Sequence, residues 1–153
     1  MDTKNLLEQL ELSDEDEITF LSKEETGLDI DMLNMVITSF GNVSNTGEGE
    51  FFFLGEDRPE FFVNRIKVTT GVLKENVALI LMELALNNAL IPLGGFSYDP
   101  DEGCILYSLK IPLIENLTEE EVIKECDLSI RLALNLSRNY AAQFSLLATR
   151  RES

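Results

Sequence analysis

Residues 77–91, VALILMELALNNALI, are the stretch that decides the fold. Within residues 77–86, Glu83 is the one ionisable group, and apolar side chains would fall on nearly every face of a helix. A membrane span needs about 20 apolar residues, whereas this run is shorter and has Asn87 and Asn88 near its end. A helix that is apolar on all sides must be surrounded by protein. The stretch therefore predicts the buried central helix of a soluble domain.

Length and composition fit one domain. The chain has 153 residues, of which 44% are hydrophobic, and this is enough for a sizeable core. Acidic residues gather near the N-terminus. We expect residues 1–26 to form an acidic helical segment and residues 27–150 to form an α+β core.

The net charge limits the partners of the chain. The sequence has 28 Asp and Glu against 12 Lys and Arg, which gives a formal net charge of −16. Such a surface repels nucleic-acid phosphates and anionic lipids, and it favours a basic or aggregation-prone partner. We therefore expect no nucleic acid and no membrane among the partners.

The cysteines and the N-terminus indicate a reducing compartment. Cys104 and Cys126 do not have CxxC spacing, so we expect neither a zinc site nor a redox motif, but two reduced core residues. Residues 1–11 show no basic region followed by an apolar run and a cleavage site. This predicts a cytoplasmic protein.

Two helices are predicted before residue 42. Ser13 and the three acidic residues after it are typical of a helix start, and Gly27 ends that segment. A second helix is expected over residues 31–41, where Gly41 is a plausible cap and Val36-Ile37-Thr38 is β-favouring. Its apolar residues recur at helical spacing: Met32, Met35, Val36 and Phe40.

Two antiparallel hairpins are predicted further along. The first pairs residues 50–54 with 60–68, and apolar side chains on both sides of its first arm indicate that both faces of that strand are covered. The second pairs residues 93–98 with 104–111 around the turn Asp99-Pro100-Asp101-Glu102-Gly103. Thr69-Thr70-Gly71 before the central helix and Pro92 after it mark its ends.

The C-terminal part predicts one long helix. Thr118 and Glu121 form a capping box, and no Gly or Pro follows, so the helix should run from residue 119 to about residue 148. Its wide apolar surface indicates contact with the sheet on one side and with a second helix or subunit on another. The predicted fold class is α+β, an antiparallel sheet of two hairpins on which the buried central helix and the long C-terminal helix pack.

The sequence lacks the residues that several common catalytic and nucleotide-binding sites require. The absence of histidine excludes Ser-His-Asp and Cys-His arrangements and histidine metal ligands, and no GxxxxGK[ST] or GxGxxG loop is present. The 99–103 turn is similar to a calcium loop, but Lys110 stands where the bidentate acid should be. No cofactor and no metal are predicted. Glu83 could have a raised pKa if desolvated, although a wet helix edge or a partner such as Arg65 explains it equally.

Five residues are the candidate partner-binding or dimer-binding face. They are Phe52, Leu54, Phe62, Leu128 and Leu132. The aromatic residues of the first hairpin could form a face for a partner chain, or they could be ordinary core and homodimer interface.

The order of elements and several short patterns resemble the YbjN-like family, whose fold is similar to that of type III secretion chaperones. The matching stretches are residues 84–88, 95–99, 103–107, 109–113 with Pro112, and 117–121, within a similarity that covers residues 50–147. The resemblance implies a small α+β domain, commonly dimeric, that binds rather than catalyses. It supplies no catalytic or ligand residues, and the acidic stretch before Glu50 has no counterpart in it.

Our prediction is therefore a non-enzymatic protein-binding domain, chaperone-like or regulatory, that holds a segment of a partner protein by strand or helix addition and forms a homodimer. The alternative is a small-molecule-binding sensory module with a pocket between the sheet and the two main helices. A carboxylate enzyme around Glu83 is a third hypothesis.

Overall fold

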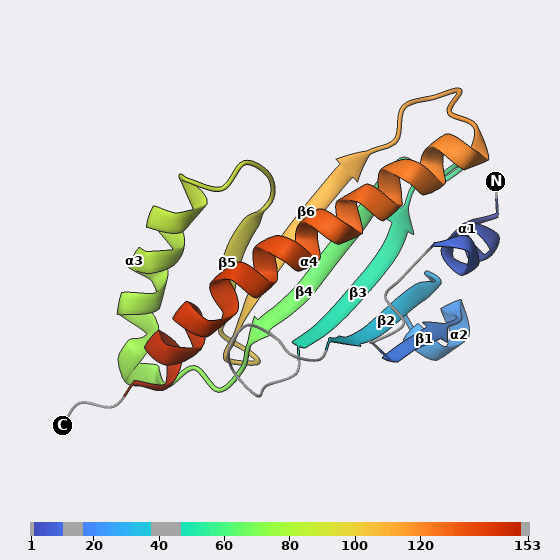
Figure 1. The fold of residues 1–153 in the computed structure, drawn as a ribbon. Helices are drawn as coiled ribbons and strands as arrows, with labels where there is room; N and C mark the ends of the chain where they lie inside the picture. Colours follow the sequence, from blue (N-terminus) through green and yellow to red (C-terminus); the bar gives the residue numbers. More distant parts are fainter. Residues whose placement is uncertain (1, 11–16, 38–46, 151–153) are drawn as a thin grey trace.

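The computed structural model describes residues 2–10, 17–37 and 47–150. In chain order the elements are α1 (Thr3–Gln9), β1 (Glu17–Leu21), α2 (Lys23–Thr26), β2 (Met32–Ile37), β3 (Gly47–Leu54), β4 (Phe61–Thr69), the 3₁₀ turn η1 (Lys74–Asn76), α3 (Val77–Asn88), β5 (Gly95–Asp99), β6 (Cys104–Pro112) and α4 (Glu119–Thr149). The strands form one six-stranded antiparallel sheet in the order β1-β2-β3-β4-β6-β5 (Figure 1). The predicted α+β class is confirmed.

Both predicted hairpins and the long helix are confirmed. Strand β3 pairs with β4, and β5 pairs with β6 around the 99–103 turn, where Asp99 Oδ1 accepts the backbone N–H of Asp101 over 2.9 Å. Helix α4 begins with the predicted capping box, since Thr118 Oγ1 accepts the N–H of Glu121 and the Glu121 side chain accepts the N–H of Thr118. Figure 1 shows α4 lying diagonally across one face of the sheet.

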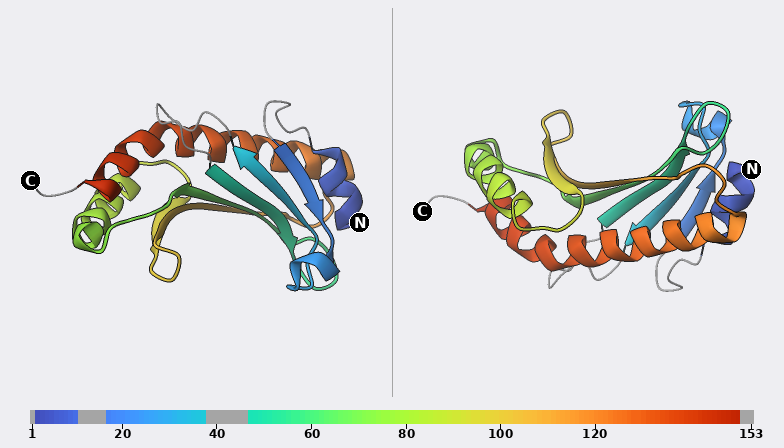
Figure 2. Two further views of the ribbon diagram at one scale, coloured as in Figure 1. Left: turned by 90° about the horizontal axis from the view of Figure 1, so that it is seen from below. Right: turned by 90° about the horizontal axis from the view of Figure 1, so that it is seen from above.

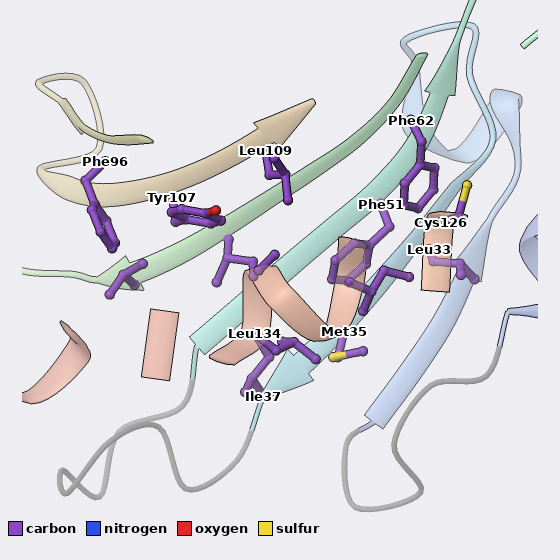
Figure 3. Close-up of a cluster of buried hydrophobic side chains, with 14 of the residues drawn as sticks. Leu33, Met35, Ile37, Phe51, Phe62, Phe96, Tyr107, Leu109, Cys126 and Leu134 are labelled. Atoms are coloured by element: carbon purple, nitrogen blue, oxygen red, sulfur yellow. The ribbon is translucent and has the colours of Figure 1, made fainter. Parts of the chain in front are cut away.

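The core lies between α4 and the sheet. Every second residue of each inner strand points toward the helix, and these side chains are almost fully buried. Figure 3 shows side chains from the strands gathered beneath α4, with Cys126 and Leu134 contributed by the helix. The rings of Phe96, Tyr140 and Phe144 meet in a chain of contacts with centroids 4.9–5.7 Å apart, which holds the last turns of α4 on β5.

Two predicted helices near the N-terminus are wrong. Residues 17–21 and 32–37 are strands β1 and β2, which extend the two-hairpin sheet to six strands. Strand β2 alternates Leu33, Met35 and Ile37 toward α4 with side chains on the opposite face, and because Met32 and Val36 on that face are also apolar, no two-residue period marks it. Gly27 does end a helix, the four-residue α2, in a left-handed conformation with φ 68°. Residues 13–16 and 38–41 of the predicted helices lie outside the described residues.

The predicted buried central helix is instead peripheral. Helix α3 packs against β5 and α4 beside one edge of the sheet, and Ile80 and Leu84 are its buried residues (Figure 1). It begins at residue 77 rather than 70, because η1 precedes it and Asn76 Nδ2 donates to the carbonyl oxygens of Ala148 and Arg150 over 2.9 and 2.7 Å. Val77 and Leu79 are half-buried, and Leu81, Met82 and Leu86 are exposed.

Candidate protein-binding surfaces

The sheet face opposite α4, here called the open face, is not covered by any described helix. Figure 2 shows that the sheet bows so that α4 lies on its convex side and the open face is concave. The connection between β3 and β4 and helix α2 project beyond the open face at one end, and the β5–β6 hairpin projects at the other. The prediction that both faces of residues 50–54 are covered is therefore wrong for the described part of the chain.

Strand register divides the open face into rows of different chemistry. One row crosses four strands with Leu21, Met32, Phe52 and Val63, and the next row toward the β3–β4 connection contains Leu54 and Phe61. We call these six residues the apolar band. Met32 is buried and the other five are half-buried, so part of each of these five side chains is open to solvent and part packs against its neighbours.

The next two rows of the open face are mainly polar, apart from Val36 and Leu106 in the second of them. Thr19, Asn34, Glu50, Arg65 and Ser108 follow one another across five strands. In the row beyond, Lys67 Nζ lies 2.9 Å from Glu102 Oε2 and 3.5 Å from Glu48 Oε2. The hydrogen bond to Glu102 raises the pKa of Lys67, so this ammonium is firmly charged and already paired.

Helix α3 presents a second apolar surface, here called the α3 face. Its large members are strongly exposed, with Leu86 at 58% and Leu90 at 79%. The exposed residues of this face are Ala78, Leu81, Met82, Ala85, Leu86, Ala89 and Leu90. None of them is ionisable. A soluble monomer seldom exposes so continuous an apolar surface without a partner for it.

The five residues predicted from sequence do not form one surface. Phe52 and Leu54 lie in the apolar band, but Phe62 has no exposed surface and packs against Phe53 in the core, with the rings tilted and their centroids 4.9 Å apart. Leu128 is 65% exposed on α4, and Leu132 is half-buried against the core. The sequence does not predict the α3 face as a binding surface, because an apolar helix of this kind predicts core residues.

The thiol and carboxylate groups of the second hairpin are held by structural contacts. Asp99, Glu102 and Cys104 have potential ligand atoms within 4.8 Å of one another, but Lys67 is bound to Glu102. Burial raises the pKa of Cys104, so its thiol stays protonated near neutral pH and is a poor metal ligand. Burial raises the pKa of Cys126 to about 12, which likewise makes that thiol unreactive. Both cysteines are free and buried, as predicted.

Glu83 lies on a peripheral helix rather than on a buried one. The residue is half-buried on a helix whose apolar neighbours Leu81 and Met82 face solvent, and its backbone carbonyl accepts Asn87 Nδ2 over 2.8 Å. Burial in a core is one way in which a carboxyl gains the raised pKa that suits a general acid. The buried helix on which the Glu83 hypothesis rested is not observed.

Two cavities of the described region lie away from the space between sheet and helices. One, of about 280 Å³, is lined by α2, the segment after it and the β3–β4 connection, and includes Lys23, Asp31 and Arg58. The other, of about 430 Å³, is an open depression at the start of α4, lined by Gln9, Ile123 and Asp127 among others. Neither matches the predicted ligand pocket.

Comparison with known proteins leaves the family open. No protein-family model matches the chain, and no curated protein matches it. The YbjN-like resemblance therefore stays a prediction. Within the described ranges, no helix has both the length and the apolar character needed to cross a bilayer.

Proposed function

We propose that the chain is a non-enzymatic, cytoplasmic protein-binding domain that holds a segment of a partner protein on the open face. The observation that carries the proposal is the apolar band, which crosses four strands on the side of the sheet that no described helix covers. A chaperone-like or regulatory role, as the family resemblance implies, fits a concave apolar surface on an acidic domain.

The same proposal assigns the α3 face to self-association. A chain with a net charge of −16 repels a second copy over most of its surface. The α3 face has no ionisable residue, so the electrostatic repulsion between two copies is weakest when they meet at this face. In a two-fold dimer the α3 helices would pack side by side, and the small Ala78 and Ala85, one heptad apart, would let their axes approach closely. The open face would then remain free for the partner.

The small-molecule alternative has less support. It requires a cavity between the sheet and helices α3 and α4, and the side chains that face α4 are packed and almost fully buried. The 280 Å³ cavity lies instead beside α2. We therefore favour protein binding.

Affinity capture with the purified full chain tests the proposed function. The wild type, the Phe52→Ser variant and the matched Leu128→Ser variant are each used to recover proteins from native cell extract. Leu128 is 65% exposed, more than any residue of the band, and lies on α4, so its variant controls for a general loss of surface hydrophobicity. We expect one or a few specific proteins that the wild type and Leu128→Ser recover and Phe52→Ser does not. Equal recovery by all three would refute a site on the open face.

A further inference from the structure

The backbone of the open face restricts what kind of segment can lie on it. The ladder hydrogen bonds of β2, β3, β4 and β6 are made within the sheet, so the face itself offers only side chains. An extended segment laid on such a face would bury N–H and C=O groups without partners, which costs free energy for each group. A helix satisfies its own backbone groups and brings only side chains to the contact. The apolar band therefore suits a helix.

The size of the band sets the length of that helix. Its long row crosses β1, β2, β3 and β4, and neighbouring strands are about 4.8 Å apart, so the row measures about 14 Å between its outer strands. At about 1.5 Å per residue, three helical turns cover this distance. The second row, Leu54 and Phe61, widens the band enough to receive the apolar stripe of an amphipathic helix.

The charges around the band indicate which sign of charge the polar side of the bound helix would carry. Glu48 and Glu50 lie on the same face, and both projecting ends of the sheet carry exposed acids. These acids are Glu24, Glu25, Glu56, Asp57, Asp101 and Glu102. Of the nearby cations, Lys67 is bound by Glu48 and Glu102, and Lys110 Nζ lies over the Phe61 ring, 4.4 Å from its centroid. Arg65 lies opposite Glu50 in the row beside the band, so the acids still outnumber the cations around it. A helix with a basic polar side gains attraction from this rim, and one with an acidic side is repelled.

We propose that the segment held on the apolar band is a basic amphipathic helix of about three turns, laid across β1 to β4. This proposal rests on the proposed function and names its class of partner. Leu21, Met32, Phe52 and Val63 receive the apolar stripe, while the acidic rim contacts the Lys or Arg side chains on either side of it.

Binding of designed peptides to the full chain tests the proposal. The ligand is a peptide of about 14 residues composed of Leu and Lys at helical spacing, with a fluorescent label. An isomer of the same composition with Leu and Lys alternating, and a Leu/Glu peptide at helical spacing, are the controls. Fluorescence anisotropy gives the Kd, and circular dichroism reports whether the bound peptide becomes helical.

We expect the helical Leu/Lys peptide to bind and become helical. Both control peptides should bind at least about tenfold more weakly, which is the change in Kd expected when one apolar side chain is no longer buried. Phe52→Ser should weaken binding about tenfold or more, whereas Leu128→Ser should leave the Kd unchanged. Val63→Thr keeps a β-branched side chain in β4 and serves as the second variant should Phe52→Ser unfold.

The opposite results would overturn the proposal. Equal affinity for the two Leu/Lys isomers, or no effect of Phe52→Ser and Val63→Thr, would mean that the peptides bind by charge alone. Loss of binding in Leu86→Ser would place the site on the α3 face. A partner captured in a Phe52-dependent manner by a chain that does not bind the helical peptide would leave the proposed function intact and refute the basic helix.

Discussion

Asn64 of β4 and Ser129 of α4 are hydrogen-bonded to each other inside the apolar core, with Asn64 Nδ2 donating to Ser129 Oγ over 3.0 Å. Both residues are buried. Asn64 Nδ2 also donates to the Leu109 carbonyl over 3.3 Å, and Ser129 Oγ donates to the Cys126 carbonyl over 2.7 Å. Apolar side chains surround this pair, so the Asn64 amide and the Ser129 hydroxyl can pair with each other at only one position of α4 along the sheet. The bond fixes the register of the long helix.

Removing one partner of this bond should destabilise the protein more than removing both. We expect Ser129→Ala to lower the free energy of unfolding by about 1 kcal/mol, because it takes away one hydrogen bond and leaves part of the buried Asn64 amide without a partner. The Asn64→Leu/Ser129→Ala double variant replaces both groups by apolar ones and should recover most of that loss. Urea unfolding of the wild type, Asn64→Leu, Ser129→Ala and the double variant measures the interaction energy between the two side chains. A double variant that is as unstable as the sum of the single variants would contradict it.

Asn88 blocks one edge of the sheet. Its amide accepts the N–H of Phe96 over 2.7 Å and donates to the carbonyl of Phe96 over 2.9 Å, so it takes the place of a neighbouring strand beside β5. We expect Asn88→Asp, which keeps the acceptor and loses the donor, to cost about 1–2 kcal/mol in urea unfolding. Asn88→Ala should also promote aggregation, visible by light scattering, because it uncovers strand-edge groups.

Asn87→Ala is the matched control for the Asn88 variants. Asn87 Nδ2 donates to the Glu83 carbonyl within the same helix, away from the strand edge. Its removal should change the free energy of unfolding by less than about 0.5 kcal/mol. An Asn87→Ala protein that aggregates as strongly as Asn88→Ala would show that general destabilisation, and not the exposed edge, is the cause.

The elements that could be predicted from sequence are those whose local signals agree with their packing. The capping box of Thr118 and Glu121 and the absence of Gly or Pro after it determine α4, and the Asp99–Gly103 turn determines the second hairpin. In β6, buried Tyr107 and Leu109 alternate with exposed Ser108 and Lys110, which is the pattern of a strand with one face in the core.

The elements predicted wrongly are those where packing overrode local signals. In β2, apolar residues on both faces removed the alternation of a strand, and the spacing of Met32, Met35 and Val36 imitated a helix. In α3, the apolar residues predict burial, but a sequence does not distinguish burial within a fold from burial by another molecule, and most of this surface is exposed in the chain itself. The same ambiguity placed Phe62 in the candidate site and left Leu86 out of it.

The stability of the protein should fall in alkaline solution because of Cys126. Burial, with a smaller contribution from Glu125 and Asp127, raises the pKa of this thiol from 9.0 to about 12. The unfolded chain therefore loses this proton near pH 9, while the folded chain keeps it until about pH 12. The stabilisation is fully present below pH 9 and is lost as the pH rises from 9 to 12, on the order of 1.4 kcal/mol per pH unit.

Urea unfolding at pH 8, 9 and 10 checks the Cys126 prediction. The Cys126→Ala protein should be less stable at pH 8, because it loses buried side-chain volume, but its stability should fall less between pH 9 and 10 than that of the wild type. Tyr107, whose pKa burial raises from 10.0 to about 12, adds to the loss chiefly above pH 10 in both proteins. Equal slopes for the two proteins between pH 9 and 10 would contradict the prediction.

Self-association through the α3 face should depend on Leu86 and not on exposed leucines outside that face. Leu86 is 58% exposed, so a two-fold contact would bury that surface on both copies, and we expect Leu86→Ser to weaken the dimer by about 2–3 kcal/mol, or about a hundredfold in Kd. Sedimentation equilibrium over a range of concentrations measures this, with Leu128→Ser, equally exposed on α4, as the control. The dimer should also strengthen with added salt, because screening reduces the repulsion between two copies of charge −16. A wild type that stays monomeric at every concentration and salt level would contradict the assignment and leave the α3 face for a different protein.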